Sequence, residues 1–127
     1  MRYLGIDYGE KRIGLALSDA EGRIAFPYKT VGQPDDIFEV IAAEGVDAVV
    51  IGLPVSLDGT DSEETRAVRA FAAMLSGSLQ LPVAFENEAF TTKIAEAHSF
   101  REHTDAAAAA IILQSYLDRQ ESLISKP

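Results

Sequence analysis

The sequence predicts an α/β domain: a mixed five-stranded sheet whose first three strands are antiparallel, with helices on both faces. Three observations lead to this fold class. Apolar segments separated by short turns fill the first 28 residues, helix and strand patterns alternate after them, and 127 residues suffice for one compact domain but not for two. An antiparallel start followed by βα units gives such a sheet. We expect the domain to span residues 1–119 and residues 120–127 to form a frayed tail.

The antiparallel start is predicted from three apolar segments. Residues 2–7 and 12–18 are apolar, and the turn-like Tyr8-Gly9-Glu10-Lys11 joins them, which indicates a β-hairpin. Residues 23–28 resemble a third short strand that ends near Pro27. Because hairpin strands pair as neighbours, these segments form one antiparallel unit.

The second part of the chain alternates between helices and strands. Asp36 and Glu39 have the spacing of a capping pair, and Gly45 is placed to end the helix that follows them. Residues 48–51 form an uninterrupted apolar run, typical of a strand buried on both faces. The remaining predicted elements are a helix from Asp61 to Gly77, a strand over 81–86, a helix over 92–98, and a final helix that Thr104 caps and Asp105 begins.

Composition and charge restrict the function classes. Eleven basic and 20 acidic residues give a net charge of −9, which argues against tight, unaided binding to nucleic acid. The absence of cysteine excludes disulfides and thiolate metal sites. No apolar run approaches the roughly 20 residues that cross a bilayer, and the first residues lack the features of a signal peptide. We therefore expect a cytoplasmic protein with no membrane partner.

Three carboxylates are the candidate functional residues. Asp7 ends the first strand, Glu88 follows the last predicted strand, and Asp105 begins the final helix. Such positions converge at the edge where ligands of α/β sheets gather, and carboxylates suit Mg²⁺ or Mn²⁺. Each residue also has an ordinary interpretation. Asp7 can bond the amides of its turn, Glu88 can be a solvated loop residue, and Asp105 can complement the helix dipole. The residues alone leave both interpretations open.

Four sequence blocks, in order, resemble the YqgF/RuvX family of pre-16S rRNA nucleases and Holliday junction resolvases. The resemblance covers nearly the whole chain, and four ordered blocks are specific where one would be weak. The blocks are Gly5-Ile6-Asp7-Tyr8-Gly9 through Lys11-Arg12-Ile13-Gly14 to Ser18-Asp19, then Gly52-Leu53-Pro54 with Asp58-Gly59-Thr60, then Glu88 with Thr91-Thr92, and finally Asp105-Ala106-Ala107 through Ile112 to Arg119.

The resemblance implies an RNase H-like fold and phosphodiester hydrolysis with Mg²⁺ or Mn²⁺. It implies that Asp7, Glu88 and Asp105 are both the catalytic residues and the metal ligands. It also implies a set of substrate-binding residues: Gly9, Lys11 and Arg12 beside the substrate backbone, and Thr91 and Thr92, which position the Glu88 loop. One departure stands out, because Asn87-Glu88-Ala89 keeps only the glutamate of the family's Asp-Glu-Arg block.

Four functions follow from these features. The leading hypothesis is an endonuclease that matures the 5′ end of pre-16S rRNA, with the substrate presented in a pre-ribosomal particle. The second is a resolvase of branched DNA, which requires a homodimer, and the sequence leaves monomer and homodimer open. The altered block at Ala89 favours a third, a non-catalytic RNA-binding assembly factor. A fourth is an ATP-binding actin-like lobe, because Asp7-x-Gly9 recurs in that superfamily, although one small domain cannot close over a nucleotide.

Overall fold

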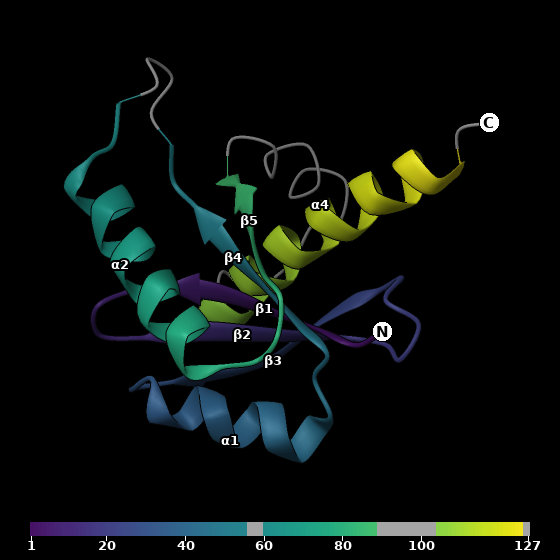
Figure 1. Cartoon of the computed structure of the whole chain (residues 1–127), viewed down its shortest axis with the longest axis horizontal. Helices are drawn as coiled ribbons and strands as arrows, with labels where there is room; N and C mark the ends of the chain where they lie inside the picture. Colours follow the sequence, from purple (N-terminus) through teal and green to yellow (C-terminus); the bar gives the residue numbers. More distant parts are fainter. Residues whose placement is uncertain (56–59, 89–103, 126–127) are drawn as a thin grey trace.

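A five-stranded mixed sheet, in the order β3-β2-β1-β4-β5, organises the molecule (Figure 1). The computed structural model describes residues 1–55, 60–88 and 104–125. β1 pairs antiparallel with β2 and β2 with β3, whereas β1 and β4, and then β4 and β5, are parallel. The mixed sheet and its antiparallel start are therefore confirmed. The strands are β1 Tyr3–Tyr8, β2 Ile13–Ser18, β3 Ala25–Val31, β4 Ala48–Leu53 and β5 Val83–Asn87.

Helices cover both faces of the sheet, as predicted. The described helices are α1 Asp35–Glu44, α2 Glu63–Ser78 and α4 Asp105–Ser125. In Figure 1, α1 and α2 lie on one side of the strands and α4 crosses the other. Two separate apolar clusters match this arrangement, one beneath α1 and α2 and one beneath α4. None of the described helices is both long and apolar enough to cross a bilayer.

Alternation along β1 assigns its side chains to the two faces. Leu4 and Ile6 are fully buried in the cluster beneath α1 and α2. Gly5 faces the opposite way, where an added Cβ would lie 2.7 Å from the Cβ of Leu113 on α4. Burying each large aliphatic side chain contributes about 1.5 to 3 kcal/mol, so the α1 and α2 face provides much of the stability.

Small residues let α4 approach the other face closely. An added Cβ at Gly14 of β2 would lie 1.9 Å from the carbonyl oxygen of Asp105, and one at Gly52 of β4 would lie 2.5 Å from Cδ1 of Ile112. The alanines over 106–110 of α4 are equally small. The close approach places the first residue of α4 directly over the end of the β1–β2 pair.

Two predicted boundaries near the start were wrong. β3 continues past Pro27 to Val31, because it is an edge strand with a bulge, where a missing amide is tolerated. α1 begins at Asp35 after Pro34, with no side-chain cap, so Asp36 and Glu39 are not a capping pair. Gly45 does end α1, at a positive φ of 64° that favours glycine.

The later elements differ from the prediction mainly at their ends. β4 extends through Gly52 to Leu53, and β5 begins at Val83. α2 begins after its cap Ser62 and passes Gly77 to end at Ser78. α4 continues to Ser125, so the predicted end at 119 was too early, since no glycine or proline occurs before Pro127. The helix predicted over 92–98 lies outside the described residues.

Candidate active site

Asp7 lies near the end of β1 on the face covered by α4. Its register partner on β2 is Gly14, and its neighbour Ile6 pairs with Ile51, one residue before Gly52. Asp7 is thus flanked on both sides by positions without side chains, which leaves room beside its carboxylate. Within the described chain the carboxylate accepts no hydrogen bond from the amides of the β1–β2 turn, so the turn-aspartate interpretation fails.

Glu88 follows β5 and points over the end of β4. An added Cβ at Gly52 would lie 3.0 Å from Oε1 of Glu88, so the carboxylate occupies the space that Gly52 leaves open. Glu88 is partly buried and is not the solvated loop residue of the ordinary interpretation. It therefore reaches from the edge strand toward Asp7.

Asp105 joins them from α4. Thr104 caps this helix as predicted, because its Oγ1 accepts a hydrogen bond from the amide of Ala107 at 3.0 Å. The Asp105 carboxylate is about one third exposed and pairs with Arg12, with 3.1 Å between Oδ2 and Nε. The structure thus brings the three predicted carboxylates to one end of the sheet and adds Arg12 beside one of them.

Burial and neighbouring negative charge both act on the carboxyl groups of Asp7 and Glu88. Burial, followed by the charges of Asp105 and Glu64, raises the pKa of Asp7 to about 6. Burial, followed by the charges of Asp7 and Glu64, raises the pKa of Glu88 to about 7. Negative charge therefore accumulates here with too little positive charge to balance it, which favours the binding of a cation.

Glu64, in the first turn of α2, is a carboxylate that the sequence did not single out. Its charge contributes to the raised pKa of both Asp7 and Glu88. Its position near Glu63 resembles an ordinary partner of the helix dipole, so pattern alone gave it no other role. Only the packing of α2 beside the β1–β2 turn reveals that it faces the carboxylates.

A hollow of about 440 Å³ opens between the β1–β2 turn and α2, next to these carboxylates. Gly9 and Lys11, two of the predicted substrate-binding residues, line it, and Lys11 is exposed. Arg12 is also exposed but pairs with Asp105. Thr91 and Thr92 lie outside the described residues. The other lining residues are Tyr8, Glu10, Glu63, Glu64, Ala67 and Val68.

The donor set fits a hard divalent cation in its chemistry. Asp7, Glu88 and Asp105 supply only carboxylate oxygen, the donor that Mg²⁺ and Mn²⁺ prefer. The absence of a side chain at Gly52 makes room for the Glu88 carboxylate, since an added Cβ would lie 3.0 Å from its Oε1. Within the described part of the chain, however, no three acidic or histidine side chains are already close enough to hold one ion. The ion pair with Arg12 holds Asp105 in its present position.

The fold defines the class of protein. The chain superposes on Thermus thermophilus RuvC with a TM-score of 0.58 at 17% identity, covering 96% of this chain and 97% of that one. RuvC in complex with a Holliday junction substrate gives a TM-score of 0.57 at 16% identity, with 95% and 96% covered. The molecule is therefore an RNase H-like α/β domain of the kind found in resolvases.

Sequence similarity identifies the family. The model of the RuvX family, described as Holliday junction resolvase, matches residues 1–119, and the chain belongs to this family. A relative from Maridesulfovibrio salexigens is 39% identical, with 94% of this chain and 99% of that protein covered. One from Nitratidesulfovibrio vulgaris is 38% identical, with 96% of each chain covered. Both are named "Putative pre-16S rRNA nuclease". Family and fold together support a nuclease, which is a hydrolase.

Proposed function

We propose that this chain is a cytoplasmic, divalent-metal-dependent endonuclease that matures the 5′ end of pre-16S rRNA. One observation carries the proposal: Asp7 of β1 and Glu88, which follows β5 and lies over Gly52, are near enough that the charge of Asp7 helps to raise the pKa of Glu88. Such an arrangement is unfavourable for stability and becomes favourable when a cation binds. The proposed substrate is taken from the names of the relatives from Maridesulfovibrio and Nitratidesulfovibrio.

The proposed roles follow from the positions of the residues. Asp7, Glu88 and Asp105 hold Mg²⁺ or Mn²⁺, with Asp7 central because the other two approach it from opposite sides. When bound, such a cation lowers the pKa of the attacking water and stabilises charge on the phosphate and the leaving oxygen. Binding requires both raised-pKa carboxyl groups to lose their protons, so they titrate as metal binds.

The substrate backbone runs past the β1–β2 turn in this proposal. The hollow beside the turn offers the backbone of Gly9 and the exposed Lys11, and the exposed Arg12 follows Lys11 in the chain. If Asp105 served as a metal ligand, the Arg12 guanidinium that now pairs with it would be available to a phosphate. Thr91 and Thr92 are proposed to position the Glu88 loop, as in the family block.

Two other functions have specific support. The family description names Holliday junction resolution, which would need two copies of the site in a homodimer. The change to Ala89 supports a binding role in ribosome assembly without catalysis. The actin-like alternative has less support, because the family model that matches residues 1–119 is described as a Holliday junction resolvase.

A direct comparison of substrates tests the proposal. The purified chain and Asp7→Asn are incubated with 5′-extended pre-16S rRNA, as naked RNA and in pre-ribosomal particles, and with a four-way DNA junction, each with Mn²⁺. The proposal expects cleavage of the rRNA by the wild type and none by the variant. Cleavage of the junction alone would establish the resolvase, and equal complementation of depleted cells by both proteins would establish the binding role.

A further inference from the structure

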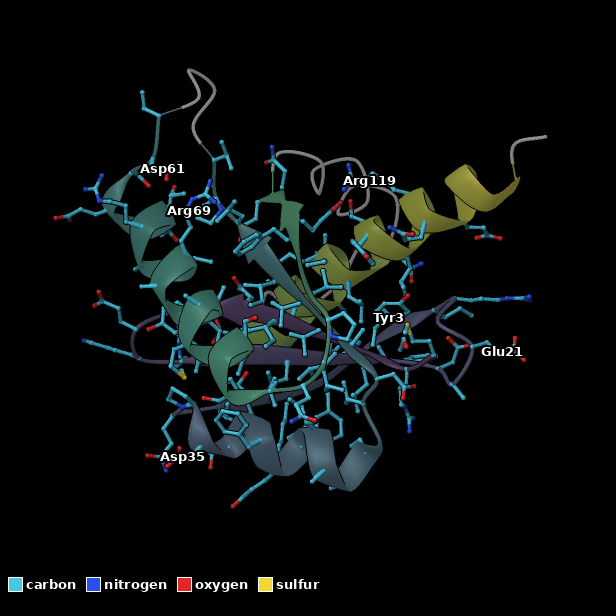
Figure 2. All side chains as sticks on the ribbon, in the orientation of Figure 1. Tyr3, Glu21, Asp35, Asp61, Arg69 and Arg119 are labelled. Carbon is cyan, nitrogen blue, oxygen red and sulfur yellow. The ribbon has the colours of Figure 1, made fainter. Side chains whose placement is uncertain are left out.

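A buried glutamate outside the proposed site connects β5 to α4. Glu86 is fully buried, and both of its carboxylate oxygens are bound by α4. Oγ of Ser115 donates to Oε2 at 2.5 Å, and Nη2 of Arg119 donates to Oε1 at 2.5 Å. The two donors are four residues apart and so lie on one face of the helix. Figure 2 labels Arg119 on α4, beside the end of β5.

Stability alone does not explain this arrangement. Taking the Glu86 carboxylate fully out of water is costly, while the Arg119 side chain that pairs with it stays about half exposed. Replacing a buried ion pair by apolar residues is often neutral or stabilising. An apolar side chain at position 86 would pack against α4 without that cost. The position of the charge in the strand offers the better explanation.

Glu86 stands two residues before Glu88, which follows the strand. Both carboxylates lie on the face covered by α4, because Glu86 is bound by α4 and Oε1 of Glu88 lies over Gly52, which also faces Ile112 of α4. Among the described strands, β5 stands at the edge of the sheet and pairs with β4 alone. Fixing the Glu86 carboxylate at two points therefore fixes the end of β5 against α4. The direction in which Glu88 projects is set by the same restraint.

The helix that holds Glu86 also carries Asp105. α4 crosses the sheet from β2, where Asp105 lies over Gly14, to β5, where Ser115 and Arg119 bind Glu86. One rigid helix thus sets the positions of two of the three carboxylates relative to each other. A shift of the β5 end by an ångström would move Glu88 away from Asp7.

We propose that Glu86, Ser115 and Arg119 form a positioning clamp that holds Glu88 in place relative to Asp7 and Asp105. The clamp rests on the proposed function, because it acts through Glu88 as a metal ligand. Glu86 and its two donors touch neither metal nor substrate through this interaction. They control metal affinity and turnover by orienting a ligand, as outer-shell groups do in metal sites.

Calorimetric titration of the full chain with Mn²⁺ tests the clamp. Glu86→Gln keeps an acceptor for Ser115 but removes the charge that attracts Arg119. We expect Mn²⁺ affinity and kcat on rRNA to fall roughly 10- to 100-fold, with KM within about threefold. The double variant E86M/R119M should show the same losses with an unchanged or higher Tm. Arg119→Lys keeps the positive charge and should therefore retain part of the Mn²⁺ affinity.

A control variant separates positioning from lost stability. Val40 of α1 is buried against the opposite face of the sheet, so Val40→Ala should lower Tm and leave Mn²⁺ affinity unchanged. If E86Q and E86M/R119M both bind Mn²⁺ like the wild type while Asp7→Asn does not, the clamp is refuted and the proposed function stands. If wild type and Asp7→Asn bind equally, both fail. Should neither Glu86 variant fold, Ser115→Ala decides by the same measurement.

Discussion

The two faces of the sheet use opposite kinds of residue on the same strands. Beneath α1 and α2, β1 and β4 present large aliphatic side chains such as Leu4, Ile6 and Ile51, all fully buried. Beneath α4, the same strands present Gly5, Asp7 and Gly52. The face beneath α1 and α2 therefore stabilises the fold by apolar burial. On the other face, small residues leave room for α4 and for the three carboxylates.

Charge is divided in a similar way. α1 carries four acidic residues and no basic one, and it packs on the face away from Asp7. Figure 2 labels Asp35 at the start of this helix and Arg119 on α4, on opposite sides of the sheet. Part of the net charge of −9 is therefore remote from the proposed substrate path. The carboxylates that matter for a cation are those that face α4.

The largest effect should come from removing the charge of Asp7. We expect Asp7→Asn to lower kcat by more than the roughly 10- to 100-fold typical of an outer-shell residue. The same change should raise the stability of the metal-free protein at pH 7 by about 1 to 3 kcal/mol, because it relieves a carboxyl group whose pKa is raised to about 6. Cleavage assays and urea unfolding measure the two effects. A variant that loses both activity and stability would contradict the proposal.

The close approach of α4 can be broken by one methyl group. Gly14→Ala places a Cβ 1.9 Å from the Asp105 carbonyl, so the start of α4 must move. We expect a loss of about 3 kcal/mol, the upper end for overpacking, together with a lower kcat because Asp105 is displaced. Gly77→Ala is the matched control, since nothing lies within 4 Å of its added Cβ. It should leave activity unchanged and stabilise α2 slightly.

Much of the fold followed from the sequence because periodicity and turn chemistry are local. The apolar segments predicted the antiparallel strands. Gly45 predicted the end of α1, and Thr104 predicted the start of α4. The ends of β3 and α4 were missed for different reasons. Pro27 is tolerated only because β3 is an edge strand, which a single segment does not reveal. α4 simply continues, because nothing in its sequence stops it before Pro127.

The candidate site was predictable only in part. Asp7, Glu88 and Asp105 were found through the family blocks, since each alone has an ordinary interpretation. Glu64 and Glu86 were not found, because their partners come from distant elements: β1 for one, and α4 for the other. Pattern reports which residues an element contains, and packing decides which of them meet.

The stability of the metal-free protein should depend on pH in a way set by Asp7 and Glu88. Their pKa values rise from 3.8 and 4.5 to about 6 and 7 on folding, so the folded state holds more protons than the unfolded state in this window. The stabilising contribution is complete below about pH 4 and is lost as pH rises through 6 to 7. We expect a decline of roughly 3 kcal/mol between pH 4 and 8, about half of what the two shifts give at about 1.4 kcal/mol per pKa unit, because both groups are partly exposed and solvent screens their charges.

Urea unfolding across this pH range measures the contribution of Asp7 and Glu88 when it is done with and without their charges. Asp19 opposes it, because the backbone amides of Ile24 and Arg23 lower the pKa of its carboxyl group. The slope of the unfolding free energy against pH should therefore be compared between the wild type and D7N/E88Q, which retains Asp19. The double variant should be flatter between pH 5 and 7. Identical slopes would show that the carboxylates do not repel one another as described.

The smallest effect concerns Arg12, which lies between the proposed metal ligand Asp105 and the proposed path of the substrate. Its exposed ion pair with Asp105 contributes about 0 to 1 kcal/mol, so Arg12→Gln should leave Tm nearly unchanged. Mn²⁺ affinity should stay equal or increase slightly, because Asp105 is released. KM for rRNA should rise several-fold, and the slope of log affinity against log salt should fall by about one as a phosphate contact is lost. Arg23→Gln, which breaks a comparably exposed pair with Glu21, is the matched control and should change neither quantity. Equal salt slopes for the two variants would place the substrate away from the β1–β2 turn.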